Sequence, residues 1–499
     1  MLNQPISGDF QGTERFELVR CLGAGGMGTV YEAIDHETTT VIALKTLHAM
    51  NANALLDFKN EFREFQNLQH PNLIALGELY AEGNGWFFTM ELVDGVHFLE
   101  WVRPGGVLDE ERLRDALLQL VEGLRALHEG QKVHRDIKPS NVLVSREGRV
   151  KLVDFGLATD LSREHRSEVN IVGTVEYMAP EQAAARQVGA AADWYSVGVM
   201  LFEALTGEVP ISGSPIEVLM NKQKMDGPRP RTRNANAPAD LDALCGDLLR
   251  FHPGTRPTGD QILERLGRRS VSRPSTSLAS FSTSAQFIGR ARELEVLRER
   301  YEASRGAAQT VLTYGESGLG KSALVRHFTE QLKREDPDVV VLAGTCYERE
   351  SVPFKAVDGL VDSLSDYMRR LPKAEAAALL PRKASLLAEV FPVLQRVEAV
   401  AEAPRSPNEV LDPQELRNRL FFAMRELLQR LADRHPVVLV IDDLQWADAD
   451  SLALLGEIMR PPEAPPLLLV ATVRSDDGES TAHRRDTIHR HLRGPIAEL

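Results

Sequence analysis

The segment VHRDIKPSN, residues 133–141, and the segment DFG that begins at Asp154 carry side chains suited to metal-dependent phosphoryl transfer. This chemistry requires the phosphates to be held in line, their charge to be neutralised and the acceptor hydroxyl to be oriented. Asp136 is expected to accept the proton of that hydroxyl, and Lys138 to point toward the transferring phosphate. Asn141 and Asp154 supply oxygens for Mg²⁺, a hard cation that prefers carboxylate, carbonyl and water ligands. The spacing therefore predicts a site that uses ATP and Mg²⁺.

A glycine-rich loop lies upstream, between the strand-like runs 16–22 and 29–34. Glycine lets the backbone turn without a Cβ penalty and approach phosphate oxygens closely. The GxGxxG pattern alone also fits a dinucleotide-binding fold, but that fold requires a helix after the loop, and the residues TVYEAI are β-branched and aromatic. Strands on both sides therefore favour a loop that covers the phosphates of ATP. The residues expected to line it are Leu22, Gly23, Ala24, Gly25, Gly26, Met27, Gly28, Thr29 and Val30.

Lys45 ends the apolar run 41–45 and is expected to bind the α- and β-phosphates. Its ion-pair partner is expected to be Glu61, in the helical stretch 54–68. Glu64 is the alternative, because it lies one turn away on a neighbouring face. Each glutamate alone would also fit a solvent-exposed helix face, where most helix glutamates lie.

Taken together, these motifs resemble those of Hanks-type serine/threonine protein kinases of the bacterial kind, over residues 16–268. The segment YMAPE, residues 177–181, resembles the one that receives the peptide substrate, and Lys138 is typical of enzymes that act on Ser and Thr hydroxyls. The resemblance implies an α+β bilobal kinase fold with a β-rich N-lobe and a helical C-lobe. Its spacing favours Glu61 over Glu64 as the partner of Lys45. A pseudokinase would lack a phosphate-handling residue, and none of these residues is missing.

The same resemblance assigns roles to residues outside the short motifs. Asp193 would brace the backbone of the HRD segment, and Arg256 would form a buried ion pair with Glu181. Removal of one partner from such a pair commonly costs about 3–5 kcal/mol, so these two residues are expected to support the fold. The adenine site is expected to involve Ala43, Met90 as gatekeeper, the hinge Glu91 to Val93, and Leu143.

The chain contains a second phosphate-binding motif, GESGLGKS, which fits GxxxxGK[ST] with Gly315, Gly320, Lys321 and Ser322 at its fixed positions. A strand-like run, 311–314, precedes it and a helical pattern follows from Ala323. We expect backbone amides at the helix N-terminus to cradle phosphates, Lys321 to reach the β- and γ-phosphates, and Ser322 to bind Mg²⁺.

A second pair of acids follows the apolar run 437–441. Asp442 is expected to act through the metal and Asp443 to polarise an attacking water, although two solvated acids after a strand would give the same pattern. Residues 287–499 resemble the AAA-like ATPase module of signal-transducing STAND proteins, on the stretches FIGRARELEVL, DDLQWADADSLALL and LLLVATVR. The resemblance implies an α/β P-loop NTPase domain with a parallel sheet. Arg474 matches a sensor position there, and an exposed strand-end arginine is the alternative.

Relatives of this module continue into a helical lid, so we expect the second domain to be incomplete at its C-terminus and to bind nucleotide rather than hydrolyse it. The domain organisation expected is an N-terminal tail (1–15), a kinase domain (16–268), a Ser/Thr-rich linker (269–286) and the ATPase module (287–499). The linker composition indicates a flexible tether, and autophosphorylation of the linker is the alternative. In the first domain, the leucine spacing over 113–127 predicts a core-facing helix with Asp109 as its N-cap.

Composition restricts the classes of partner. A formal net charge of −14 over 499 residues argues against bulk attraction to nucleic acid or to an anionic bilayer. The N-terminus lacks a signal-peptide pattern and the apolar runs are strand-sized, so no membrane segment and a cytoplasmic location are expected. The three cysteines, Cys21, Cys245 and Cys346, lack metal-type spacing and are expected to be buried thiols.

The function expected from the sequence is that of an ATP-dependent protein serine/threonine kinase in signal transduction, with a C-terminal nucleotide-binding regulatory module. Its partners would be protein substrates with Ser or Thr acceptors, the chain itself among them, and nucleotide-dependent self-association is a further expectation. One alternative is a P-loop NTPase switch in which the kinase domain is mainly a scaffold. Another is an interaction platform that nucleotide merely orders.

The segment 154–181 is expected to be regulated by phosphorylation, because Arg135 before the catalytic Asp136 commonly pairs with a phosphorylated residue. Among Ser162, Ser167 and Thr174, we prefer Ser167 as the phosphosite. Thr174 is expected to hydrogen-bond the catalytic loop, and Asn170 stands where relatives often carry a threonine.

Mass spectrometry of ATP-incubated protein is expected to find phosphate on Ser167, since a phosphate there would offer Arg135 a charge-assisted partner. Fully active protein with an unmodified Ser167 would contradict this assignment.

Overall fold

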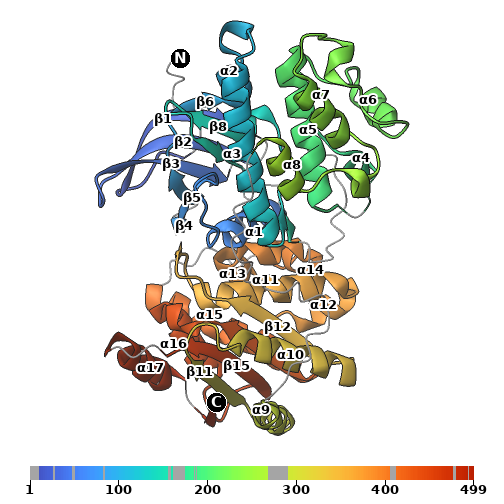
Figure 1. Cartoon of the computed structure of the whole chain (residues 1–499). Helices are drawn as coiled ribbons and strands as arrows, with labels where there is room; N and C mark the ends of the chain where they lie inside the picture. The colour runs from blue at the N-terminus through green and yellow to red at the C-terminus, as the bar shows by residue number, and fades with distance from the viewer. Residues whose placement is uncertain are drawn as a thin grey trace. The chain divides into compact units, whose positions relative to one another are not determined.

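A computed structural model of the chain describes residues 10–25, 28–47, 51–82, 85–154, 159–160, 175–184, 186, 188–267, 290–404, 412–475, 479–492 and 494–499. These residues form two compact units, drawn mainly from residues 1–278 and 279–499. In Figure 1 the first unit runs from blue to green and the second from yellow to red. Several predicted features lie outside the described residues: Gly26, Met27, Ser167, Thr174 and the linker 269–286.

The first unit begins with an antiparallel, half-buried sheet in the order β1-β2-β3-β5-β4. Its strands are β1 (Phe16–Ala24), β2 (Gly28–Asp35), β3 (Thr40–Leu47), β4 (Leu76–Glu82) and β5 (Gly85–Glu91). Burial alternates along β2, as expected for a strand with one face on the core. The glycine-rich segment connects β1 and β2, as the strand-like runs on its two sides predicted.

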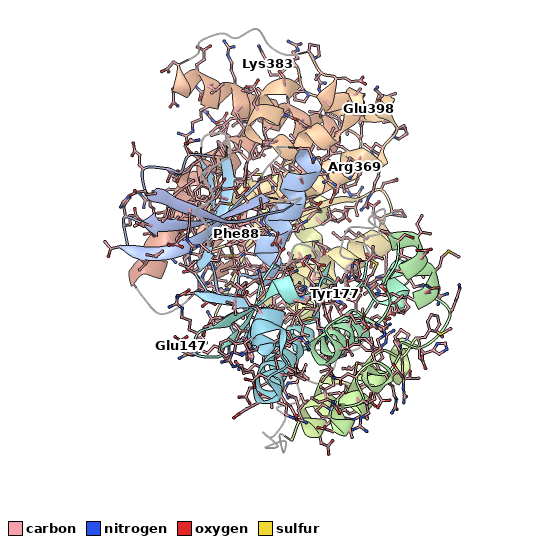
Figure 2. All side chains as sticks on the ribbon, turned by 90° about the horizontal axis from the view of Figure 1, so that it is seen from above. Phe88, Glu147, Tyr177, Arg369, Lys383 and Glu398 are labelled. Carbon is pink, nitrogen blue, oxygen red and sulfur yellow. The ribbon has the colours of Figure 1, made fainter. Side chains whose placement is uncertain are left out.

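A single helix, α1 (Ala52–Phe65), packs on this sheet through aromatic side chains. The rings of Phe58 and Phe62 lie 5.0 and 5.6 Å from the ring of Phe88, which is labelled in Figure 2. These contacts fix the rotation of α1 and therefore the direction of Glu61, which precedes Phe62. The helix ends at Phe65 rather than at the predicted residue 68, because residues 66–67 form a turn.

The rest of the first unit is mainly helical. Asp109 caps α3 (Glu110–Glu129) by accepting a hydrogen bond from the backbone N–H of Arg112 at 3.1 Å, as the sequence predicted. The helix α5 (Ala190–Thr206) is mostly apolar and almost entirely buried, as a central helix must be. The other helices are α2 (Phe98–Val102), α4 (Pro180–Ala183), α6 (Pro215–Lys222), α7 (Ala239–Leu248) and α8 (Gly259–Arg265).

Short strands connect the sheet-rich and helical parts. β6 (Gly95–His97), β8 (Val142–Ser145) and β9 (Val150–Leu152) form a small sheet, and β7 (Lys132–Val133) pairs with β10 (Thr159–Asp160). The catalytic-loop motif lies between β7 and β8, and Asp154 follows β9. The β-rich N-lobe and the helical C-lobe are therefore present as predicted (Figure 1).

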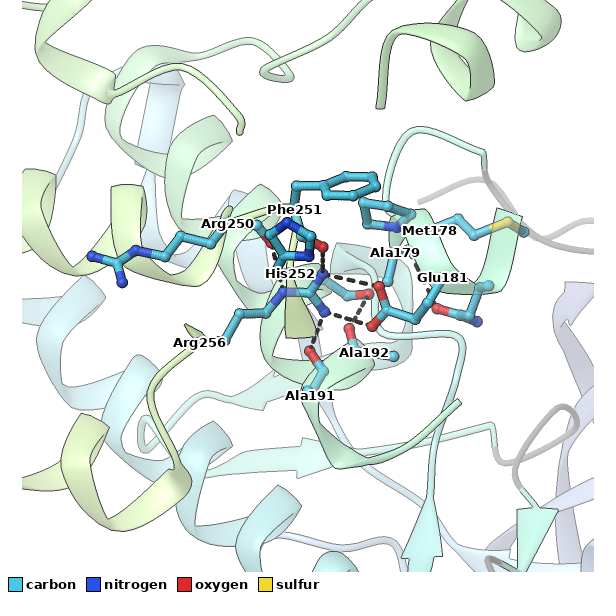
Figure 3. A network of polar contacts seen from close by, with 12 residues as sticks. Met178, Ala179, Glu181, Ala191, Ala192, Arg250, Phe251, His252 and Arg256 are labelled. Atoms are coloured by element: carbon cyan, nitrogen blue, oxygen red, sulfur yellow. Dashed lines mark hydrogen bonds and ion pairs between the residues drawn. The ribbon is translucent and has the colours of Figure 1, made fainter. Parts of the chain in front are cut away.

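A buried ion pair stabilises the helical lobe. Arg256 donates from Nη1 and Nη2 to the two carboxylate oxygens of Glu181, at 2.6 and 2.9 Å, and the arginine side chain is fully buried. The same guanidinium also donates to the carbonyl oxygens of Arg250, Ala191 and Phe251, so its hydrogen-bonding capacity is used (Figure 3). This closed network fixes the start of α4 against the loop before α8.

The second unit is built on a parallel sheet in the order β12-β14-β15-β11-β16. Its strands are β11 (Gln309–Gly315), β12 (Val340–Thr345), β14 (Val437–Asp442), β15 (Leu467–Arg474) and β16 (Ile496–Glu498), and a short strand β13 spans Glu350–Ser351. The central strands are continuous apolar runs because both of their faces are covered. In a parallel sheet the carboxyl ends meet at one edge, so Gly315, Asp442 and Arg474 converge there.

Helices surround this sheet: α9 (Ala291–Ser304), α10 (Lys321–Glu335), α11 (Lys355–Arg370), α12 (Lys373–Leu379), α13 (Ala384–Val390), α14 (Glu398–Ala401), α15 (Pro413–Ala432), α16 (Ala449–Ile458) and α17 (Glu479–His491). Alternate side chains of the strands enter two separate apolar clusters, one containing Leu312 and Leu439 and the other Val311 and Val438. The α/β fold with a parallel sheet is therefore as predicted.

The cysteines follow the prediction only in part. Cys245 and Cys346 are buried thiols, but Cys21 is partly exposed, because it lies on β1 at the edge of its sheet. No helix of the described ranges combines the length and the apolar content needed to cross a bilayer.

Replacement of Arg256 by alanine is expected to lower the free energy of unfolding of the first unit by about 3–5 kcal/mol, because Glu181 would remain buried without its cation. Urea unfolding followed by tryptophan fluorescence would measure the change, in a Trp446→Phe background so that the signal comes from the first unit. Arg146→Ala is the matched control, since Arg146 and its partner Asp94 have 78% and 73% exposed side chains. That pair should contribute less than about 1 kcal/mol. Equal losses in the two variants would contradict the assigned role.

Candidate functional site

A buried lysine connects two acids in the first unit. Lys45 Nζ, on β3, lies 2.6 Å from Oε1 of Glu61 on α1 and 2.8 Å from Oδ1 of Asp154. The side chains of Lys45 and Glu61 are only 9% and 5% exposed, whereas that of Asp154 is 48% exposed. Glu64, the alternative partner, instead lies 3.8 Å from Lys132 Nζ. The structure thus joins Lys45 to Glu61 and not to Glu64.

The charges of this cluster support one another. Burial alone would lower the pKa of Lys45, but the carboxylates of Glu61 and Asp154 outweigh burial and raise it. Burial likewise acts to raise the pKa of Asp154, and Lys45 reverses that effect and lowers it. The lysine is therefore a permanent cation and Asp154 a permanent anion near neutral pH.

The catalytic-loop residues form a second cluster. Lys138 Nζ donates to Oδ2 of Asp136 at 2.7 Å, and Nδ2 of Asn141 donates to the same oxygen at 3.0 Å and to the Asp136 carbonyl at 2.9 Å. Pro139 to Asn141 form a single 3₁₀ turn that brings these side chains together. The Asn141 carbonyl also accepts from the N–H of Val153, which places the loop directly beside Asp154.

The backbone around these acids is held in an uncommon conformation. Arg135 and Asp154 have φ angles of 66° and 62°, in the left-handed region that side chains other than glycine rarely adopt. Asp193 stabilises the first of them by accepting from the N–H groups of His134 and Arg135 at 2.9 and 2.8 Å. A third bond joins Asp193 to His128 Nε2 at 2.8 Å. Asp193 therefore occupies the bracing position that the family resemblance suggested.

His134 and His128 support the loop, and the sequence reading assigned neither of them a role. His134 is fully buried, its Nδ1 accepts from the N–H of Asp136 at 3.3 Å, and Nε2 lies 3.4 Å from the Val153 carbonyl. Because Nδ1 acts as acceptor, the proton must be on Nε2, and burial lowers the pKa of His134, which favours this neutral form. The HRD motif itself could have indicated a role for His134. The contact of His128 with Asp193 is visible only in the tertiary structure.

Arg135 has free hydrogen-bonding capacity within the described part of the chain. Its Nε atom is buried and has no hydrogen-bond partner among the described residues. Burial lowers the pKa of Arg135, against the opposing effect of Asp193 and Glu64. A partly desolvated guanidinium with an unused donor is suited to an anion.

The residues predicted to surround nucleotide lie on the strands of the N-lobe and on β8. Leu22 to Ala24 end β1, Gly28 to Val30 begin β2, Ala43 lies on β3, and Met90 and Glu91 end β5. Val93 follows β5, and Leu143 lies on β8, where it pairs with His97. Gly25 closes the β1–β2 turn through a bond to the Gly28 carbonyl at 2.9 Å. A Cβ atom at Gly23 or Gly25 would meet no atom of the described residues within 4 Å, so their packing does not require glycine there. Close approach of phosphates would require it.

The donor set of the first unit fits Mg²⁺. Among the described residues, no three His, Cys, Asp or Glu side chains form a cluster that could enclose a metal ion. Mg²⁺ is commonly held by one or two carboxylates together with phosphate and water oxygens. Asp154 would provide one carboxylate ligand and Asn141 one amide oxygen.

The phosphate-binding loop of the second unit begins at the end of β11 and leads into α10. Gly318 and Gly320 have φ angles of 85° and 78°, which only glycine adopts without strain, and α10 begins at Lys321 with no side chain capping it. Lys321 Nζ donates to the carbonyls of Gly315 and Glu316 at 2.6 and 2.8 Å, so the lysine folds back over the loop. Uncapped N–H groups and a lysine at one helix N-terminus form an anion site.

The metal-binding residues of this motif meet at the sheet edge. Ser322 Oγ donates to Oδ1 of Asp442 at 2.9 Å, and Thr472 Oγ1 donates to the same oxygen. A hydroxyl and a carboxylate in contact, next to the loop, fit a Mg²⁺ ion that also binds phosphate oxygens. Thr472 was missed by the sequence reading, because an apolar strand containing one threonine carries no separate signal.

Asp443 is held by Arg474. The guanidinium donates from Nε and Nη2 to the two oxygens of Asp443 at 3.0 and 3.1 Å, and Gln445 Nε2 donates to Oδ1 at 2.8 Å. Asp443 itself has a φ of 58°, stabilised by a bond from its N–H to Thr472 Oγ1 at 2.9 Å. Arg474 is therefore paired across the strand ends to the acid expected to polarise water, and is more than an exposed strand-end residue. Gln445 was not foreseen.

Comparison with known families divides the chain in the same way. A model described as protein kinase domain matches residues 16–266, and one described as AAA ATPase domain matches residues 286–470. Serine/threonine-protein kinases are similar to this chain over about half of its length. The serine/threonine-protein kinase PrkC of Bacillus subtilis is 32% identical over 235 residues, which cover 46% of this chain and 36% of that protein.

The serine/threonine-protein kinase PknB of Mycobacterium tuberculosis is 31% identical over 289 residues, which cover 52% of this chain and 46% of that protein. PknB of Mycolicibacterium smegmatis is 32% identical over the same length. The chain thus spans less than half the length of the curated relatives it matches. On the kinase match and on the geometry above, the chain belongs to the protein kinase domain family, and an AAA ATPase domain follows its kinase domain.

Proposed function

We propose that the kinase domain transfers the γ-phosphoryl group of ATP to serine or threonine hydroxyls of proteins. The observation that carries this proposal is the pair of clusters on either side of the Asn141–Val153 contact. One holds Lys45 between Glu61 and Asp154, and the other holds Asp136 with Lys138 and Asn141. Positioning and charge neutralisation supply most of the catalysis in phosphoryl transfer, and these clusters provide both.

Each residue has a role that its contacts allow. Lys45, fixed by Glu61, would bind the α- and β-phosphates, and Asp136 would orient the acceptor hydroxyl and take its proton. Lys138, 2.7 Å from Asp136, would remain close to the transferring phosphoryl group and offset its charge. Asn141 and Asp154 would hold Mg²⁺, which neutralises phosphate charge when bound.

The proposed substrates are proteins. The segment 177–181 would receive them, because Gln182, just after it, donates from Nε2 to the Arg135 carbonyl at 2.9 Å, next to the proposed base. We further propose that a phosphate on Ser167 would engage Arg135, whose Nε has no partner among the described residues. Thr174 remains proposed as a hydrogen-bonding residue of the same segment.

For the ATPase domain we propose nucleotide binding as a regulatory function. The Ser322–Asp442 contact would open to admit Mg²⁺, and Lys321 would leave the loop carbonyls for phosphates. Nucleotide-dependent self-association and a cytoplasmic location are retained as parts of the proposal. The proposal of self-association rests on the AAA ATPase match, and that of a cytoplasmic location on the free cysteines.

Radiolabel transfer from ATP to protein tests the kinase proposal. Lys45→Ala and Asp136→Asn are each expected to reduce labelling by about 10²-fold or more, because they remove phosphate binding and general-base function. Lys321→Ala is the matched control, a lysine of the other phosphate site, and should leave labelling within a few-fold of wild type. Labelling that survives Lys45→Ala and disappears in Lys321→Ala would favour the alternative, a P-loop switch with a kinase scaffold.

Replacement of Ser322 by alanine tests the second site. In a Lys45→Ala background, Ser322→Ala is expected to weaken MgATP binding by about 10-fold, since one charge-assisted interaction is worth about 1.5–3 kcal/mol. Binding of ATP in EDTA should change much less. Titration calorimetry would measure both, and equal effects with and without Mg²⁺ would refute the role of Ser322 as a metal ligand.

A further inference from the structure

A buried lysine lies beneath the segment proposed to receive the protein substrate. Lys222 is the last residue of α6 and is 0% exposed. Its Nζ donates to three backbone carbonyls of that segment, those of Val175, Glu176 and Met178, at 2.9, 2.6 and 2.7 Å. The sequence gives no sign of a role for this lysine, because a lysine at a helix end ordinarily lies in solvent.

The three contacts explain how the lysine can be buried. An ammonium group has three N–H donors and each one meets a carbonyl oxygen, so backbone dipoles replace the lost water. The ring of Tyr195 lies 5.4 Å from the same nitrogen and adds a cation–π contact. Burial lowers the pKa of Lys222 to about 7, and the carboxylate of Glu176 acts in the opposite direction. Only the ammonium form satisfies all three carbonyls.

Neighbouring contacts hold the same stretch of backbone. Gln223 Nε2 donates to the Pro180 carbonyl at 2.5 Å, and Ser196 Oγ on α5 donates to the Tyr177 carbonyl at 2.9 Å. Tyr177, labelled in Figure 2, donates from its hydroxyl to Glu203 on α5. The backbone of segment 175–180 is therefore held by residues of α5 and α6 and by Gln223, mostly through its carbonyl groups.

We propose that Lys222 is a positioning residue for the protein substrate, because it holds the backbone of residues 175–178 in the conformation that receives the chain around the acceptor hydroxyl. The inference rests on the proposed kinase activity and extends it to one residue outside the known motifs. Within the described part of the chain, Lys222 hydrogen-bonds to the carbonyls of Val175, Glu176 and Met178 and to none of the residues proposed to bind ATP. Its loss should therefore affect recognition of the protein acceptor and leave ATP binding intact.

Steady-state kinetics of the full chain with myelin basic protein as acceptor would test the proposal. Lys222→Met keeps the length of the side chain and removes its donors. It is expected to raise the KM for the acceptor by about 10-fold or more, since small displacements in a binding segment have effects of up to about 10²-fold. The KM for ATP should stay within about twofold. Lys224→Met, an exposed lysine on the same stretch, is the matched control and should match wild type.

Hydrogen exchange gives a second measurement, with faster exchange expected at residues 175–180 in Lys222→Met and no change at α3. Should Lys222→Met fail to fold, Lys222→Gln replaces it, because its amide keeps two N–H donors and should give an intermediate rise in acceptor KM. An unchanged acceptor KM, or parallel changes in both KM values and in the melting temperature, would overturn the positioning role. A wild-type chain that transfers no phosphate would overturn the kinase proposal itself, and this inference with it.

Discussion

The kinase domain depends on the burial of one cation between two anions. Lys45 is almost completely removed from water, and a buried ammonium is tolerated only when its charge is matched and its donors are used. Glu61 comes from a helix and Asp154 from the loop after β9, so the match exists only when helix, sheet and loop have their correct relative positions. The aromatic packing of α1 on Phe88 and the position of β9 are therefore requirements of this charge balance.

Both domains contain residues with uncommon backbone conformations near their proposed phosphate sites. In the kinase domain, Arg135 and Asp154 adopt left-handed φ angles, and Asp193 stabilises the first through two backbone N–H groups. In the ATPase domain, Asp443 is left-handed and Thr472 stabilises it in the same way. Such residues cost about 1–3 kcal/mol each, and strain of this size is typically found where function fixes the geometry.

The lysines of the two domains also differ in the groups to which they hydrogen-bond. Lys45 is held by carboxylates, which keep it charged and fixed in place. Lys321 and Lys222 are held by backbone carbonyls, two in the first case and three in the second. Lys321 is also buried, at 7% exposed, but it begins α10 beside the phosphate-binding loop, where phosphates could replace the carbonyls as partners. Lys222 is fully buried, and in its ammonium form its three carbonyl contacts support the segment 175–178.

Sequence patterns were sufficient for the fold class, and they named most of the residues now proposed to bind phosphate. Glycine spacing, alternating strands and a leucine-lined helix report local backbone preferences, and these need no knowledge of distant residues. The choice between Glu61 and Glu64 was different, because helical periodicity alone left both open and the preference for Glu61 came from family spacing; in the structure, Lys45 contacts Glu61. His128, Thr472 and Lys222 carried no usable signal, since each contacts residues far away in the chain. Local chemistry determined which side chains could act, whereas the tertiary structure decided which of them meet, because contacts between distant segments depend on how helices and sheets pack.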